Sequence, residues 1–276
     1  MSKTEDLIRP DALSMPMRIY RGEAQAAAPL VLHLHGGAFV EGALDNGRVV
    51  AGLLADAGAV VVSVEYPLAP RHPFPQALEA AFGALEWLHK TRGRVASRKS
   101  RLFVAGEEAG GNLAAGLALM VRDRQAPELA GQMLLSPMLD PRMATCSMRE
   151  AEAGPVGCKW ADGWHDYLGS ADKAAHPYAS PLVSTRLAGV APALVVTAED
   201  DLFRDEALAY ARRLRAAGAE VHESVLAGPT GWPCALHDPQ VPLAPWTSAV
   251  RDHLKKFFAA VSRVSGCACA VRPLHN

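Results

Sequence analysis

The chain lacks several features that mark particular classes of protein. Its 276 residues carry a net charge of −1 at pH 7, so neither nucleic acid nor an anionic membrane is a predicted partner. No run of about 18 apolar residues occurs, so no membrane-spanning helix is expected. The first six residues are polar and lack the apolar core of a signal peptide, which favours a cytoplasmic protein.

Cysteines are few and irregularly spaced. Their odd number does not predict a disulfide framework, and the five are Cys146, Cys158, Cys234, Cys267 and Cys269. The last two thiols and the nearby His275 cannot complete a tetrahedral metal site. We therefore expect no metal and no other cofactor, and a poorly ordered tail over residues 264–276.

Apolar runs typical of strands alternate with segments typical of helices. This pattern predicts an α/β fold with a mostly parallel, doubly wound sheet and helices on both faces. The expected strands are 30–34, 59–64, 101–105, 132–135, 193–197 and 220–225, with an antiparallel edge strand at 17–20. The expected helices are 48–57, 76–91, 112–124, 205–217 and 248–261.

Residues 140–187 interrupt this alternation. They contain Trp160, Trp164, Tyr167 and Tyr178 but no clear strand, which favours a small packed cap over a bare loop. An insertion there is expected to lie over the carboxyl ends of the strands, where open α/β sheets bind ligands. We expect its aromatic rings to fill the cap, and residues 1–276 to form a single domain.

Two glycine-rich segments carry the chemistry. Gly106-Glu107-Glu108-Ala109-Gly110 joins an expected strand to an expected helix, the context of a nucleophile elbow, but Glu108 stands where a serine is usual. His35-Gly36-Gly37-Ala38-Phe39 follows another expected strand. Its glycines allow backbone N–H groups to approach a ligand oxygen, as in an oxyanion hole.

The chain resembles the hormone-sensitive-lipase group of α/β-hydrolases, which includes many bacterial carboxylesterases. The resemblance runs from about Arg18 to about Phe258 and implies an α/β-hydrolase fold and carboxylic ester hydrolysis. The segment before Arg18 is shorter than the family usually has, which predicts a reduced cap. The matching segments are those at 35–39 and 106–114, with Glu65 to Pro75, Pro177 to Leu182 and Thr197 to Glu206.

The resemblance places Glu108 at the nucleophile position and Asp201 at the position of the triad acid. The triad histidine falls on Thr230 or Gly231, so no histidine fits; His222 comes earlier and His237 later. The implied oxyanion donors are Gly36, Gly37 and Ala109. Without the serine and its base we expect no hydrolysis through an acyl-serine.

The main interpretation is a pseudoenzyme, a non-hydrolytic protein that binds a small molecule or an ester-like compound. In such a protein the pocket and the glycine-rich loop at residues 35–39 would remain, and the side chain of Glu108 would bind a structural partner. We expect that partner to be Arg204 or the first N–H groups of the helix that contains Asn112.

Three enzymatic alternatives remain open. Glu108 could act as a general acid or base, with a pKa raised by burial under the cap and by nearby Asp201. It could act as a nucleophile on ester-like substrates. Together with Glu199, Asp200 and Asp201 it could also hold a hard cation. A homodimer is a further possibility that the sequence does not decide.

Overall fold

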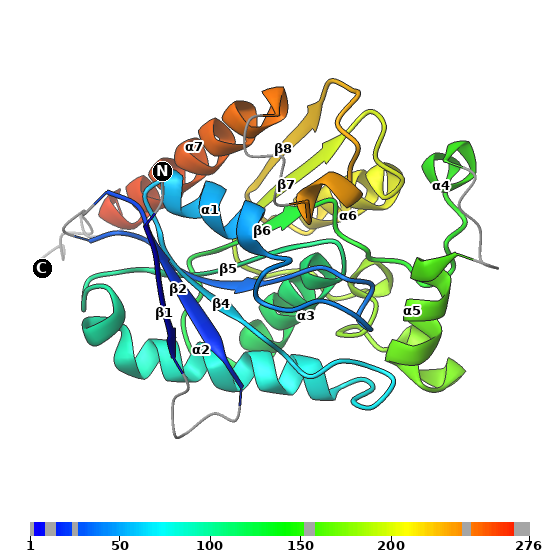
Figure 1. Cartoon of the computed structure of the whole chain (residues 1–276), viewed down its shortest axis with the longest axis horizontal. Coiled ribbons are helices and arrows are strands. Elements are labelled where there is room, and N and C mark those ends of the chain that lie inside the picture. Colours follow the sequence, from blue (N-terminus) through cyan, green and yellow to red (C-terminus); the bar gives the residue numbers. More distant parts are fainter. Residues whose placement is uncertain (1–2, 9–14, 24–26, 152–157, 239–243, 268–276) are drawn as a thin grey trace, which may run out of the picture.

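The computed structural model describes residues 3–8, 15–23, 27–151, 158–238 and 244–267. The strands of this described part form one eight-stranded sheet with the order β1-β2-β4-β3-β5-β6-β7-β8 (Figure 1). The strands are β1 Lys3–Ile8, β2 Met17–Arg21, β3 Leu30–Leu34, β4 Val60–Val64, β5 Leu102–Glu107, β6 Gly131–Leu135, β7 Ala193–Ala198 and β8 Val221–Leu226.

Strands β3 to β8 run parallel, whereas β2 is antiparallel to β4. The expected antiparallel strand at 17–20 is therefore present, but its expected place at the edge is wrong. Strand β1 pairs with its outer side, Lys3 opposite Arg21 and Ile8 opposite Met17. The sequence of β1 is largely polar and lacks the apolar run that marks the inner strands, so its pattern gave no strand signal.

Helices cover both faces of the sheet. In Figure 1, α1 and α7 lie on one side and α2 and α3 on the other. One hydrophobic cluster joins the sheet to α2, α3 and α6, and a second joins its opposite face to α1 and α7. The helices are α1 Arg48–Asp56, α2 Gln76–Val95, α3 Ala109–Arg124, α4 Cys146–Glu150, α5 Lys159–Leu168, α6 Arg204–Ala216 and α7 Pro245–Cys267.

This architecture confirms the predicted fold class. Every residue of β3, β4, β5, β6 and β7 is buried, because helices cover both sides of the parallel part of the sheet. Helix α3 is buried from Ala109 to Val121. Its alanines and glycines allow this close packing; a Cβ on Gly116 would approach the backbone oxygen of Tyr178 to 2.5 Å.

The cap contains α4, α5 and two short 3₁₀ helices, Ala171–Ala175 and Pro181–Val183. In Figure 1, α4 and α5 lie at the end of the molecule opposite the two termini. Trp164 and Tyr167 are buried against Phe39, with ring centroids 5.0 and 3.9 Å from its ring. These two aromatic rings therefore pack as cap core.

The C-terminal helix α7 includes the first residues of the expected tail and continues to Cys267. Residues 268–276, with Cys269 and His275, lie outside the described part. Within the described residues, no helix is both long and apolar enough to cross a bilayer.

Candidate active site

The elbow is a tight strand–turn–helix. Strand β5 ends at Glu107, α3 begins at Ala109, and Glu108 lies between them with φ 53° and ψ −117°. A side chain at such a φ is strained by on the order of 1–3 kcal/mol. The turn also requires small neighbours, because a Cβ on Gly106 would collide with the backbone of Gly110, and one on Gly110 with that of Leu34. The chain thus keeps a strained elbow although its central residue is a glutamate.

The carboxylate of Glu108 accepts hydrogen bonds from four donors. Its Oε2 is 3.0 Å from the backbone N of Gly37 and 2.6 Å from Nε2 of His237. Its Oε1 is 3.1 Å from the backbone N of Ala38 and 2.6 Å from Nε1 of Trp160. The side chain is 1% exposed, so the carboxylate lies inside the protein and has two donors on each oxygen.

The donors come from three separate parts of the chain. Gly37 and Ala38 belong to the loop after β3, where their φ values of 118° and 49° turn successive N–H groups toward Glu108. Trp160 lies in the first turn of α5, with its ring edge-on to Phe203 at 5.7 Å. His237 follows the 3₁₀ helix Cys234–Leu236, which returns the chain to the elbow.

Glu108 and His237 form a close pair in which the carboxylate is buried and the imidazole is 15% exposed. Burial would raise the pKa of Glu108, but the hydrogen bond and charge of His237, the N–H of Gly37 and the charge of Lys159 hold that pKa below its usual value. Burial would lower the pKa of His237, but Glu108 raises it above its usual value. The predicted rise in the pKa of Glu108 is therefore wrong, because the donors around the carboxylate outweigh its desolvation.

The second ring nitrogen of His237 is not oriented by an acid. Its Nδ1 is buried and has no hydrogen-bond partner among the described residues. Asp201 bonds elsewhere, to the hydroxyls of Thr197 at 2.6 Å and Ser136 at 2.8 Å and to the backbone N of Phe203 at 2.9 Å. Burial, the largest influence on this carboxyl, raises its pKa. The structure thus brings Glu108 and His237 together and gives Asp201 other partners.

Thr230 belongs to a loop that Asp200 anchors. Oδ1 of Asp200 accepts from the hydroxyl of Thr230 at 2.8 Å, and Oδ2 accepts from the backbone N of Thr230 at 2.7 Å and of Gly231 at 2.8 Å. Thr230 is buried, with 7% exposure. Thr230, at the expected histidine position, therefore stabilises its own loop through Asp200. The histidine that contacts Glu108 at the elbow is His237.

The backbone donors differ in part from those that the resemblance implied. Gly37 donates to the Glu108 carboxylate, but the N–H of Gly36 donates to Oε1 of Glu107 at 3.1 Å. Ala109 is the buried first residue of α3, directly after Glu108. Ala38 donates to the carboxylate beside Gly37.

The two partners expected for Glu108 are wrong. Arg204 pairs with Glu150 at 3.0 Å and Asp205 at 3.3 Å, on the side of α6. The Glu108 side chain makes no capping hydrogen bond to α3, and its two oxygens bond to Gly37, Ala38, Trp160 and His237 instead. Among the described residues, no group of three or more His, Cys, Asp or Glu side chains is placed to hold a metal ion.

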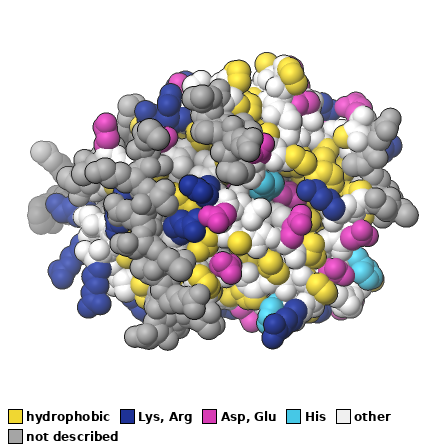
Figure 2. Space-filling model, in the orientation of Figure 1, with side chains coloured by type: hydrophobic (Ala, Val, Ile, Leu, Met, Phe, Trp, Pro, Cys, Tyr) yellow, Lys and Arg dark blue, Asp and Glu magenta, His cyan; other side chains and the backbone are white. Residues whose placement is uncertain are grey.

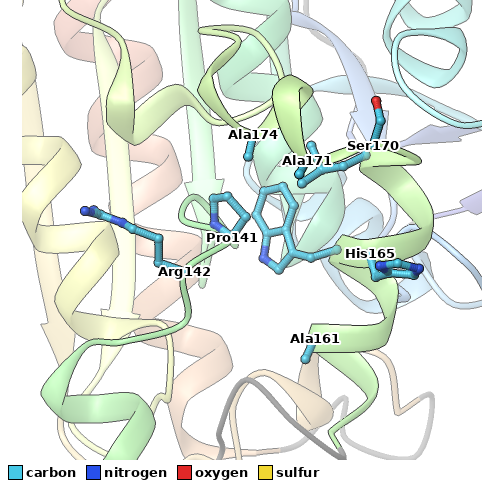
Figure 3. A pocket seen from close by; sticks show the side chains of 9 residues that line it. Pro141, Arg142, Ala161, His165, Ser170, Ala171 and Ala174 are labelled. Carbon is cyan, nitrogen blue, oxygen red and sulfur yellow. The ribbon is translucent and has the colours of Figure 1, made fainter.

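A hollow of about 370 Å³ lies between α5, the segment at Pro141 and Arg142, and the 3₁₀ helix Ala171–Ala175 (Figure 3). Its lining is mostly apolar and contains neither Glu108 nor His237. On the face shown in Figure 2, basic and acidic side chains lie among one another.

Several known proteins with similar sequences are esterases. The chain is 38% identical over 216 residues to the carboxylic ester hydrolase LipN of Mycobacterium tuberculosis. The aligned region covers 75% of this chain and 57% of LipN. Over 223 residues the chain is 31% identical to an arylesterase of Saccharolobus solfataricus, which covers 79% of this chain and 72% of that protein. The chain thus spans little more than half of LipN's length.

Several solved structures with a similar fold are also esterases. The esterase LipW from Mycobacterium marinum superposes with a TM-score of 0.78 at 34% identity, covering 93% of this chain and 82% of that one. A thermostable esterase from Pseudomonas putida superposes with a TM-score of 0.80 at 29% identity, covering 94% and 83%. The family model of the α/β-hydrolase fold matches residues 31–230, and the chain therefore belongs to the α/β-hydrolase family.

Proposed function

We propose that this protein is a carboxylic ester hydrolase in which the Glu108–His237 pair replaces a serine and its histidine. The observation that carries the proposal is the 2.6 Å contact between these side chains at a retained elbow, beside the N–H groups of Gly37 and Ala38. The similarity to carboxylic ester hydrolases supports ester substrates. The buried acid–base pair supplies groups that can move a proton.

In the proposed reaction the ester carbonyl oxygen binds the N–H groups of Gly37 and Ala38, which polarise it. The Glu108 carboxylate leaves these donors, and its pKa rises because it loses the hydrogen bonds that stabilise its charge. A proton then passes from His237 to Glu108. The pair becomes a neutral imidazole beside a neutral carboxylic acid, which are a base and an acid ready for use.

Water then attacks the carbonyl carbon while Nε2 of His237 accepts one of its protons. The tetrahedral intermediate breaks its bond to the alcohol oxygen, which takes the proton from Glu108. The products are the carboxylic acid and the alcohol, and the pair returns to imidazolium and carboxylate. No serine is acylated, in agreement with the absence of a serine at the elbow.

The test is hydrolysis of p-nitrophenyl acetate by the purified protein. We expect steady turnover without a stoichiometric burst, and a fall of about 100-fold or more in kcat for Glu108→Gln and for His237→Gln, since general acid–base groups contribute on this scale. The exposed Glu128 provides the matched control Glu128→Gln, which should not change the rate. Equal rates for all variants, or a burst that Ser136→Ala abolishes, would contradict the mechanism.

A second candidate function is binding without hydrolysis. It is favoured by the hydrogen bonds that Glu108 makes to the N–H groups of Gly37 and Ala38, because they block the place of an ester carbonyl. A thermal-shift screen with small acids, esters and divalent cations tests it. If the wild type is inactive but binds, and the double variant Glu108→Ser/Thr230→His gains esterase activity, the scaffold is intact and only the chemistry is lost.

We further propose that the hydrolase works in the cytoplasm as a single domain of residues 1–276, with a cap at about 140–187, and that it needs no cofactor. Size-exclusion chromatography with light scattering decides between the monomer and the homodimer.

A further inference from the structure

We infer that the donors around Glu108 form a binding site for a small free carboxylate, and that Glu108 itself fills this site in the resting protein. The inference rests on the proposed function only in naming the natural ligand, the acid product of ester hydrolysis. The site itself rests on the four contacts to the carboxylate.

None of the four donors belongs to the elbow. Gly37 and Ala38 lie after β3, Trp160 on the cap and His237 after a distant 3₁₀ helix. A change at position 108 therefore leaves every donor in its own element. The donors also match an anion, because imidazolium, indole N–H and backbone N–H groups all donate, and Lys159 lies 4.9 Å from the Trp160 ring.

The missing atoms define the ligand. Replacing Glu108 with alanine removes Cγ, Cδ and both carboxylate oxygens, which together are the heavy atoms of acetate. Replacing it with glycine also removes Cβ, and the missing atoms are then those of propionate. Because the side chain is 1% exposed, either change leaves buried donors unsatisfied, and filling the space with a carboxylate restores their hydrogen bonds.

In the wild type, Glu108 acts as an intramolecular competitor. The net binding free energy of a free acid is small, because the acid must first displace the Glu108 carboxylate from the same donors. The site therefore selects against its own acid product while Glu108 is seated. An ester must displace the same side chain before its carbonyl reaches Gly37 and Ala38, so Glu108 lowers the apparent affinity for substrate.

Calorimetric titration with sodium acetate, at ionic strength held constant with sodium chloride, tests the inference. We expect Glu108→Ala to bind acetate about 10-fold or more tightly than the wild type does, and more tightly than the variant binds neutral acetamide, since charge-assisted hydrogen bonds are the stronger ones. Glu108→Gly should shift the preference from acetate to propionate. Adding Trp160→Phe to Glu108→Ala should weaken acetate binding by roughly 10-fold.

The control Glu128→Ala removes the same charge at an exposed position and should bind acetate as weakly as the wild type. Equal acetate binding by the wild type and Glu108→Ala would overturn the inference. If circular dichroism shows that Glu108→Ala is unfolded, Glu108→Gly carries the test, and its indifference to propionate would overturn the inference as well. An inactive wild type together with acetate binding by Glu108→Ala refutes the hydrolase alone.

Discussion

Two adjacent glutamates, Glu107 and Glu108, each pair with a histidine, and the two pairs differ in solvent exposure. Glu107 bonds to Nε2 of His33 at 2.8 Å, both side chains are 0% exposed, and Nδ1 of His33 bonds to the Ser63 hydroxyl at 3.0 Å. Glu108 bonds to His237 at 2.6 Å, and the histidine is 15% exposed. The groups are the same, but only the second pair has a partly exposed member.

The difference follows from the geometry of the strand end. Glu107 is the last residue of β5, and its side chain bonds to His33 of β3, whose other ring nitrogen bonds to Ser63 of β4. Glu108 occupies the elbow, and its side chain meets the loop after β3 and the cap. One peptide step thus separates a pair that links three strands from a pair that contacts the loop after β3 and the cap.

Breaking the inner pair should have the largest effect. Glu107→Leu leaves His33 and the N–H of Gly36 without their acceptor inside the protein. We expect a loss of about 3–5 kcal/mol in the free energy of unfolding, since each of the two buried donors left without an acceptor costs about 1–3 kcal/mol. Urea denaturation measures it, with Glu128→Leu as the exposed control. A loss under about 1 kcal/mol would show that the inner pair does not tie the strands.

The outer pair should depend on pH. The pKa of Glu108 is lowered from 4.5, so its contribution is present above that pH and is lost as pH falls through the lowered pKa. The pKa of His237 is raised from 6.5, so its contribution is complete below that pH and is lost as pH rises through the raised pKa.

A double-mutant cycle with Glu108→Gln and His237→Gln should therefore give a coupling energy of about 2 kcal/mol that is largest between pH 4.5 and 6.5. Urea denaturation at a series of pH values measures the cycle. A coupling energy that is constant from pH 4 to pH 9 would contradict the ion pair.

The smallest expected effect sharpens the role of the cap. Trp160→Phe keeps the aromatic packing against Phe203 but removes one donor to Glu108. We expect a loss of about 1.5 kcal/mol, typical of a hydrogen bond to a charged group, and an upward shift of the Glu108 pKa. Denaturation and an NMR titration of the Glu108 carboxyl carbon measure the two effects. An unchanged titration of the Glu108 carboxyl would show that the Trp160 N–H does not stabilise its charge.

Much of the fold could be predicted because the parallel strands are buried on both faces and appear as continuous apolar runs. Strand β1 could not, since its polar sequence becomes a strand only by pairing with β2. Helix α3 begins at Ala109, three residues before the expected start at Asn112, because the glycines that suggested a loop are part of the buried first turn.

The elbow and the glycine-rich loop followed from motifs whose spacing is local. His237 did not, because a motif search places the histidine near Thr230, whereas a 3₁₀ helix brings a later residue to Glu108. Trp160 was expected to pack inside the cap, and only the position of α5 over the elbow makes its N–H a donor. Ala38, and not Gly36, donates to Glu108 beside Gly37. This choice depends on backbone dihedral angles, which residue identity does not specify.

The contact between Trp160 and Glu108 joins the cap to the central sheet. When Glu108 leaves its donors, α5 loses a polar anchor, so the departure of the carboxylate and local opening of the cap are thermodynamically coupled. The rate of backbone amide hydrogen exchange along α5 then reports whether Glu108 is bound to its donors. A ligand that displaces Glu108 and bonds to Trp160 in its place restores protection, whereas one that displaces it without bonding to Trp160 leaves the cap to exchange faster.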